Sequence, residues 1–215
     1  TAMRKVMSTA DTRKVTSVTS TKRDTSATVM KRDMSATAMR KVMSTAATEK
    51  VTSATAIRTK VKTSVVILNW NTTGYLEKFV PGILKSLEGM DAELVVADNA
   101  STDGSMQMME SKFPDVKRII LDKNYGFTGG YNKALAQLDS EYFVLLNSDI
   151  EVPEGWLQPL VETLDNNPEV GACAPKLHSW YERNKFEYAG AAGGYIDCFG
   201  FPLCRGRIMQ MLETD

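Results

Sequence analysis

The chain has 215 residues, and its 26 Lys and Arg balance its 26 Asp and Glu, so the formal net charge at pH 7 is zero. The balance hides a split, because residues 1–62 hold 14 basic and 4 acidic residues whereas residues 63–215 hold 12 and 22. No apolar run approaches the ~18 residues of a membrane-spanning helix, and no signal peptide is recognisable. Composition therefore argues against a transmembrane protein.

Three cysteines, Cys173, Cys198 and Cys204, are widely spaced and match no zinc-binding pattern. An odd set of this kind is typical of a reducing compartment. We therefore expect a cytoplasmic protein, with peripheral contact at the inner face of a membrane left open as an addition.

Residues 1–62, the repeat tract, are built on six similar units of nine residues and contain no Gly, Pro or aromatic residue. Nine residues make two and a half helical turns, so the units place no continuous apolar stripe on a helix. A segment with so few large apolar side chains cannot offset the entropy cost of ordering. We predict a basic, Ser/Thr-rich tract that is largely disordered. The alternative is a binding arm that attracts nucleic acid or anionic lipid by charge alone.

From Thr63 onward, short apolar segments alternate with segments of helical periodicity. Strands that alternate with helices at this spacing indicate βαβ units and a mostly parallel sheet. We therefore predict one α/β domain over residues 63–215. Its predicted strands cover 64–68, 93–97, 116–121 and 142–146, with 171–177 as a further candidate, and its predicted helices cover 75–88, 106–112, 130–138 and 156–166.

Polar side chains follow three of these strands directly. In a parallel sheet the carboxyl ends of the strands share one edge, which is where open α/β sheets bind their ligands. One carboxylate at such an edge can hold a hard divalent cation, and the cation can hold a diphosphate. For Asn147 and Asp149, the alternative is a strand followed by an Asx turn without a ligand. The three groups are Asn69 with Asn71, Asp98 with Asn99, and Asn147 with Asp149.

A glycine-rich segment, Asn124–Asn132, lies between the second and third of these groups and leads into a predicted helix. Glycines such as Gly126 let the backbone approach a ligand closely, and the start of a helix offers N–H groups to phosphate. The segment therefore strengthens the case for a phosphate-bearing ligand at the same edge of the sheet.

Competing motifs are weaker. Residues 99–110 match several positions of a calcium-binding loop, but such a loop follows a helix and residues 93–97 are a predicted strand. Neither a G-x-G-x-x-G fingerprint nor a P-loop is present. His178 is the only histidine, and we expect it to have a structural or surface role.

The segments SVVILNWNTTGYLEKFVPGIL, VVADNASTDGS, NYGFTGGYNKAL and YFVLLNSDIEV, followed by APKL and AGAAGGYIDCFG, resemble the family 2 glycosyltransferases of the GT-A fold. The likeness is strongest to rhamnosyltransferase-like bacterial members that build surface polysaccharides and cell walls. It covers about residues 63–215 and none of the repeat tract. The resemblance implies a Rossmann-like sheet and a UDP- or dTDP-sugar donor, dTDP-rhamnose among them. It also implies a saccharide or lipid-linked acceptor and an inverting displacement.

The resemblance also implies roles for single residues. Asp98 would accept a hydrogen bond from a pyrimidine base, and Asp149 would ligate Mg²⁺ or Mn²⁺. Asn147 stands where the family has the first Asp of an Asp-x-Asp motif, so one charge is lost while an oxygen acceptor remains. The residues that the resemblance places at the nucleotide-sugar site are Asn69, Asn71, Asp98, Asn99, Gly126, Asn132 and Asn147.

The chemistry needs two more functions. A bound cation stabilises the charge that grows on the leaving phosphate, and a single Asp is enough because Mg²⁺ keeps waters and takes phosphate oxygens. The acceptor hydroxyl needs a base, which relatives carry downstream of APKL. We therefore expect the catalytic base beyond Asp215 and assign neither Glu213 nor Asp215.

Three alternatives stay open. The chain could be an inactive fragment that only binds nucleotide sugars, or it could act through the charge of the repeat tract, although nucleic acid is not an expected partner. It could also be a nucleotidyltransferase. That class would need a basic, glycine-rich loop after the first strand, and residues 69–74 contain no basic residue.

Overall fold

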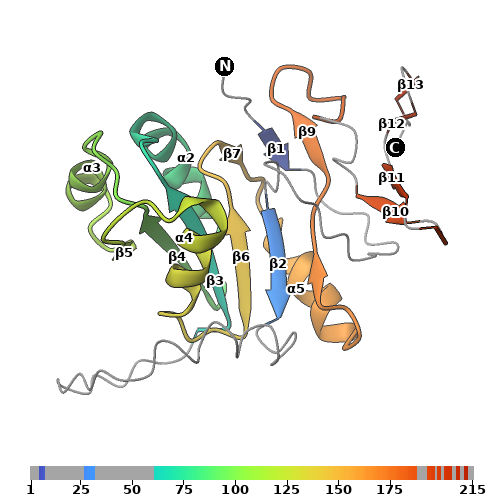
Figure 1. The fold of residues 1–215 in the computed structure, drawn as a ribbon, viewed down its shortest axis with the longest axis horizontal. Helices are drawn as coiled ribbons and strands as arrows, with labels where there is room; N and C mark the ends of the chain where they lie inside the picture. The colour runs from blue at the N-terminus through green and yellow to red at the C-terminus, as the bar shows by residue number, and fades with distance from the viewer. Residues whose placement is uncertain are drawn as a thin grey trace.

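A computed structural model describes residues 5–7, 27–31, 61–187, 193–196, 198–199, 201–204, 207–208 and 211–212. A six-stranded sheet in the order β5-β4-β3-β6-β2-β8 runs through its centre (Figure 1). The strands are β2 (Ala27–Lys31), β3 (Thr63–Asn69), β4 (Ala92–Asp98), β5 (Lys117–Ile120), β6 (Tyr142–Leu146) and β8 (Ala172–Cys173).

Four neighbouring strands, β5, β4, β3 and β6, run parallel to one another. β2 is antiparallel to both of its neighbours, β6 and β8. The sheet is therefore mixed but mostly parallel, which confirms the predicted α/β class.

Both faces of the parallel strands are buried, because successive side chains point to opposite sides and each side is covered by helices. On one face Val66, Val95 and Phe143 form a cluster with Tyr131 of α4 (Gly126–Leu135), which stands in front of the sheet in Figure 1. This double burial explains why the strands are nearly continuous apolar runs. The opposite face is covered by α2 (Thr73–Ser86), α3 (Ser105–Lys112) and α5 (Leu157–Asn166).

Most element boundaries differ from the sequence-based prediction by one to three residues, and two differences have a clear physical reason. The helix expected from Gly130 begins at Gly126, because neighbouring side chains bond the backbone at its start, as described below. The single strand expected over 171–177 is divided into β8 and β9 (Leu177–Ser179). Pro175 lies in the break, where its lack of an N–H removes a ladder donor.

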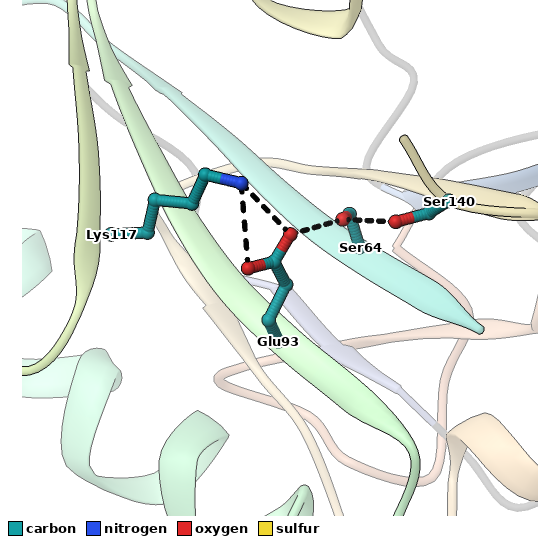
Figure 2. Close-up of polar contacts among 4 residues, drawn as sticks. All are labelled: Ser64, Glu93, Lys117 and Ser140. Carbon is teal, nitrogen blue, oxygen red and sulfur yellow. Dashed lines mark hydrogen bonds and ion pairs between the residues drawn. The ribbon is translucent and has the colours of Figure 1, made fainter. Parts of the chain in front are cut away.

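The amino ends of the parallel strands are joined by a partly buried polar network (Figure 2). The Ser64 hydroxyl donates to Glu93 Oε1 at 2.8 Å and lies 2.7 Å from the hydroxyl oxygen of Ser140. Lys117 Nζ donates to the same Glu93 oxygen at 3.1 Å, so the carboxylate has a positive partner. Four consecutive strands of the sheet are thus connected at this edge, which we call the amino edge.

Part of the repeat tract lies inside the sheet. β2 belongs to the tract, yet its Val29 is fully buried between β6 and β8. This differs from the expectation of disorder, because one unit of the tract carries an apolar, β-branched residue at a position that faces the core. Most of the tract lies outside the described residues, and the domain boundary at residue 62 stays a prediction.

The remaining strands are short. β1 (Lys5–Met7) pairs with β7 (Ile150–Glu151) and with β9. No helix in the described part of the chain is long and apolar enough to cross a membrane. Two hairpins follow near the end of the chain, formed by β10 (Gly194–Ile196) with β11 (Pro202–Cys204) and by β12 (Arg207–Ile208) with β13 (Met211–Leu212).

Candidate functional site

The polar groups that follow β3, β4 and β6 lie along one edge of the sheet, which we call the carboxyl edge. Asn69 pairs with Asp98 in the ladder between β3 and β4. The ladder between β3 and β6 ends at Leu146, one residue before the turn Asn147–Asp149. Because β4 and β6 are the two neighbours of β3, Asp98 and Asp149 follow strands about 10 Å apart.

Asn69 is fully buried and uses its side chain entirely inside the protein. Its amide nitrogen lies 2.8 Å from Asp98 Oδ1 and within 2.9 Å of the hydroxyl oxygens of Ser101 and Ser105. Its carbonyl oxygen accepts from the Thr72 hydroxyl at 2.6 Å. In this position Asn69 holds Asp98 and two loops in place, which favours a positioning role over direct contact with a ligand.

Asp98 is also almost completely buried, with 3% of its surface exposed. One of its carboxylate oxygens accepts from Asn69, and the other accepts from the backbone N–H of Ser101 at 3.0 Å. Both donors are neutral, and the described residues provide no ion pair to Asp98. The carboxylate is therefore fixed in orientation by neutral donors alone.

Asn71 connects the same two loops from the exposed side. Its backbone has φ of +55°, a left-handed conformation that Asn tolerates better than most residues. Its side-chain oxygen accepts from the N–H of Thr102 at 2.8 Å, and its own N–H donates to Ser101 Oγ. Asn71 is thus bonded to the loop after β4, at the place predicted for the nucleotide pocket.

Asp103 joins the starts of two helices. Its Oδ2 accepts from the N–H and the hydroxyl of Thr73 in α2, and its Oδ1 accepts from the N–H of Ser105 in α3. Burial opposes ionisation, but the hydrogen bonds from Thr73 and Ser105 outweigh it and lower the pKa of Asp103 to about 2. A carboxylate is also favoured by the positive ends of both helices.

Asn99 ties the glycine-rich segment to the end of β4. Its side-chain nitrogen donates to Asn124 Oδ1 at 2.9 Å and to the carbonyl of Gly126 at 3.1 Å, and its oxygen accepts from the N–H of Tyr125. Asn124 Oδ1 in turn accepts from the N–H of Gly126. These bonds let α4 begin early, and they occupy backbone N–H groups that the sequence had suggested for phosphate.

α4 is held against two strand ends at once. Gly130 lies so close to β3 that an added Cβ would come within 2.8 Å of the Leu68 methyl groups and 3.2 Å of Asn99 Nδ2. The Tyr131 hydroxyl donates to the carbonyl of Leu146 at 3.1 Å, and burial raises the pKa of this phenol. The helix therefore connects the end of β4 with the turn that contains Asp149.

The other predicted site residues are more accessible. Asn132 is exposed on α4, and Gly126 is exposed at its start with φ of +67°, which only glycine adopts easily. Asn147 and Asp149 are half-buried in the tight turn between β6 and β7. No group of three or more His, Cys, Asp or Glu in the described ranges is arranged to hold a metal ion.

Several site features were not predicted from the sequence. Trp70 follows Asn69 and is 56% exposed, and Phe127 in the first turn of α4 is 51% exposed, so two aromatic surfaces lie beside the carboxyl edge. A groove of about 730 Å³ runs between α3 and the edge strand β5 and reaches Asp98 and Ser101. The signal in the sequence that could have predicted these features is an aromatic residue next to the polar residues at a strand end.

His178 has a structural setting. Its Nδ1 lies 2.7 Å from the carbonyl oxygen of Arg183, and its ring meets Phe186 edge-on at 5.3 Å. It belongs to β9, outside the groups at the carboxyl edge.

The fold is that of an α/β protein whose polar strand ends converge at one edge of a mostly parallel sheet. The family model for glycosyl transferase family 2 matches residues 64–202. The chain belongs to this family, and its sheet is mostly parallel with helices on both faces, as the sequence predicted.

The matches with curated relatives cover about half of the length of this chain. An uncharacterized glycosyltransferase of Nostoc sp. is 30% identical over 114 residues, which cover 52% of this chain and 35% of the relative. The N-acetylglucosaminyl-diphospho-decaprenol L-rhamnosyltransferase of Mycobacterium tuberculosis is 25% identical over 124 residues, or 53% of this chain and 40% of the relative. The chain thus spans between a third and two fifths of the length of these relatives.

Among solved structures, a mannosyltransferase from Pyrobaculum calidifontis in complex with GDP-Man and Mn²⁺ is similar, with a TM-score of 0.46 and 24% identity. The match covers 53% of this chain and 35% of that one. Residues 1–349 of S. aureus TarS in complex with UDP-GlcNAc give a TM-score of 0.42 and 27% identity, over 49% and 31% of the two chains.

Proposed function

We propose that this domain binds a nucleotide-diphosphate sugar at the carboxyl edge and that the whole protein transfers the sugar to a saccharide or lipid-linked acceptor. The observation that carries the proposal is the connection of three strand ends. Asn69 bonds Asp98, Asn99 bonds the start of α4, and Tyr131 of α4 bonds the strand that leads to Asp149. One extended ligand can therefore reach all of them.

The proposed donor is a UDP- or dTDP-sugar. The fixed carboxyl group of Asp98 suits the N–H group of a pyrimidine base, and the exposed ring of Trp70 offers the base a stacking surface. dTDP-rhamnose is the first donor to test, because one relative is an L-rhamnosyltransferase. An acceptor in surface polysaccharide synthesis is in keeping with the lipid-linked acceptor in that relative's name.

The residues of the turn after β6 fit Mg²⁺ or Mn²⁺. Asp149 supplies a carboxylate and Asn147 an amide oxygen, and both are ligand types that these hard cations prefer. A single carboxylate is enough if the diphosphate oxygens complete the coordination. When bound, the cation would stabilise the charge on the leaving diphosphate.

The acceptor hydroxyl also needs a base, and none of the described residues is proposed for this role. Glu213 and Asp215 lie outside the described residues. The proposal for these residues is therefore donor binding, whereas transfer is proposed for the whole protein.

Titration calorimetry with the 215-residue chain tests donor binding. In the presence of Mg²⁺ we expect dTDP-rhamnose and UDP-GlcNAc to bind, with GDP-mannose as a purine control that binds more weakly. Replacing Mg²⁺ by EDTA should weaken the pyrimidine donors at least about tenfold. If none of the donors binds, the proposed site is wrong. If the affinity is the same in EDTA, the metal has no role in donor binding.

A further inference from the structure

Tyr131 of α4 carries a hydroxyl group into an apolar part of the core. Its side chain is 3% exposed and lies in a cluster with Val66, Val95 and Phe143. A phenol in such surroundings costs free energy unless its hydroxyl is hydrogen-bonded, and phenylalanine would fill nearly the same space without that cost. What the tyrosine adds to this place is therefore the hydrogen bond of its hydroxyl.

The partner of this hydroxyl belongs to the last residue of β6. The hydroxyl donates to the carbonyl oxygen of Leu146 at 3.1 Å, and the bond is buried. Burial raises the pKa of the phenol, and a hydrogen bond with the backbone of Leu68, the next-to-last residue of β3, partly opposes the rise. One hydroxyl thus lies between the ends of two neighbouring strands.

The ladder between β3 and β6 stops at this point. Its last pair contains Leu146, whereas the ladder between β3 and β4 continues to Asp98. The chain passes from β3 to β4 on one side and later enters β6 on the other side of β3, which makes this the switch point of the sheet. Tyr131 therefore holds the end of β6 where the ladder no longer does.

The turn that contains Asp149 begins directly after the carbonyl that Tyr131 holds. Asn147 is the next residue, and the turn ends at Ile150, which is fully buried in β7. With only three residues between the two anchors, a shift of the Leu146 carbonyl would move the whole turn. The place of Asp149 thus depends on the hydroxyl of Tyr131.

Helix α4 connects this turn to the glycine-rich segment. The side chain of Asn99 holds the start of the helix through the carbonyl of Gly126 and the N–H of Tyr125. Tyr131 lies about 7.5 Å further along the helix axis than Gly126. Between them, Phe127 is 51% exposed and meets the ring of Tyr131 edge-on at 4.9 Å. One short helix therefore links the accessible segment to the end of β6.

We propose that Tyr131 is a positioning residue whose hydroxyl sets the place of Asp149 relative to the glycine-rich segment. A donor held by the segment and a cation held by Asp149 are then coupled, so that each strengthens the binding of the other. This inference rests on the proposed function, because it concerns the same donor and cation. Without the hydroxyl, the turn would have to be ordered on binding, and part of the contribution of the cation would be lost.

Tyr131→Phe tests the inference, because it removes the hydroxyl and keeps the ring beside Phe127. The matched control is Tyr142→Phe at the opposite end of β6, where the buried hydroxyl bonds Asp165 at 2.6 Å. Each variant loses one hydrogen bond and should lower Tm by about 3 °C. The two variants are therefore similar in stability, and only Tyr131→Phe changes a group beside the turn.

Hydrogen–deuterium exchange of the chain without ligand gives the first measurement. Peptides that cover residues 146–150 should exchange at least about fivefold faster in Tyr131→Phe than in the wild type, and at the wild-type rate in Tyr142→Phe. Calorimetry with dTDP-rhamnose gives the second, which is the ratio of the affinity in Mg²⁺ to the affinity in EDTA. This ratio should fall at least about threefold in Tyr131→Phe, with the affinity in EDTA unchanged, and should stay at the wild-type value in Tyr142→Phe.

Equal exchange of the turn in the two variants, or an unchanged affinity ratio in Tyr131→Phe, would overturn the inference. An equal fall of the ratio in both variants would also overturn it, because lost stability would then be the cause. If no donor binds to any of the three proteins, the proposed function fails, and the exchange of the turn alone decides whether Tyr131 positions it.

Discussion

The two edges of the sheet both carry a carboxylate within a hydrogen-bonded network, half-buried at the amino edge and almost completely buried at the carboxyl edge, yet the partners of the two carboxylates differ in charge. At the amino edge Glu93 has Lys117 as a positive partner, and its remaining contact is with the Ser64 hydroxyl (Figure 2). At the carboxyl edge the partners of Asp98 are the neutral amide of Asn69 and a backbone N–H. The first carboxylate thus has a cationic partner, whereas the described residues give the second only neutral donors.

This difference separates a structural network from a candidate binding site. An ion pair between strands fixes their register. Because its charged groups are already paired with each other, it provides few groups that could bind a ligand. A fixed carboxylate without a cationic partner, beside a groove and exposed aromatic side chains, can select a hydrogen-bond donor. A buried polar cluster therefore does not mark a functional site unless the balance of its charges is considered.

The largest effect is expected at the carboxyl edge, from Asn69→Leu. The change conserves volume but leaves Asp98 without one of its donors and Thr72 without its acceptor, all in a buried place. We expect a loss of about 3 kcal/mol in the free energy of unfolding, together with weaker donor binding. Urea denaturation measures the first effect. Asn71→Gly, which suits the left-handed backbone, is the control and should cost less than about 1 kcal/mol.

A smaller loss of stability is expected at the amino edge. Glu93→Ala removes the partner of Lys117 and of the Ser64 hydroxyl, and should cost about 2 kcal/mol. Donor affinity should not change, because this edge is remote from the proposed site. The double variant Glu93→Ala with Lys117→Ala isolates the ion pair in a mutant cycle. A loss of donor affinity without a change in fold would contradict the distinction between the two edges.

Asp103→Asn should have a moderate effect that depends on pH. The folded-state pKa of Asp103 is about 2, below its ordinary value of 3.8, so its contribution is complete above about pH 4 and is lost as pH falls toward 2. At pH 7 we expect the variant to be about 1 kcal/mol less stable, as for the loss of a helix cap. The difference between the two proteins in free energy of unfolding should disappear in acid, as followed by urea denaturation at several pH values. A difference that is the same at every pH would mean that ionisation of Asp103 does not cause the loss of stability.

The smallest expected effect concerns Cys173 in β8, the last strand of the sheet, away from the two networks. Burial raises the pKa of the Cys173 thiol to about 12, whereas Cys198 is exposed. In the native chain at pH 8, iodoacetamide should therefore modify Cys198 rapidly and Cys173 very slowly. Mass mapping over time gives the two rates. Equal rates would show that Cys173, beside Val29 of β2, is open to solvent.

Much of the fold was predictable because the strands are buried on both faces. A run such as Tyr142–Leu146 has the same apolar signal wherever it lies in a sheet, and the observed β6 has these bounds. β2 was not predictable in this way. Its unit is nearly identical to the following unit, which has Met34 and Ala38 in place of Thr25 and Val29. The burial of Val29 depends on its pairing with β6 and β8.

The candidate site was predictable as a set of strand ends but not as a network. Asn69 and Asp98 could be assigned to one edge from the alternation of strands and helices. That Asn69 is fully buried, and that Asp103 joins two helix starts, depends on contacts between loops that are 30 residues apart in sequence. Such contacts leave no periodic signal in one sequence.

The central claim is that the carboxyl edge holds a nucleotide through a cation at Asp149. Electron paramagnetic resonance of Mn²⁺ tests it most directly, because the signal of free Mn²⁺ falls when the ion is bound. With dTDP-rhamnose present, we expect the wild-type chain and the control Glu169→Ala, an exposed carboxylate after α5, to remove free Mn²⁺ to the same extent. Under the same conditions, the amount of free Mn²⁺ that Asp149→Ala removes should be at least about tenfold smaller. Equal loss of free Mn²⁺ in all three proteins would contradict the claim.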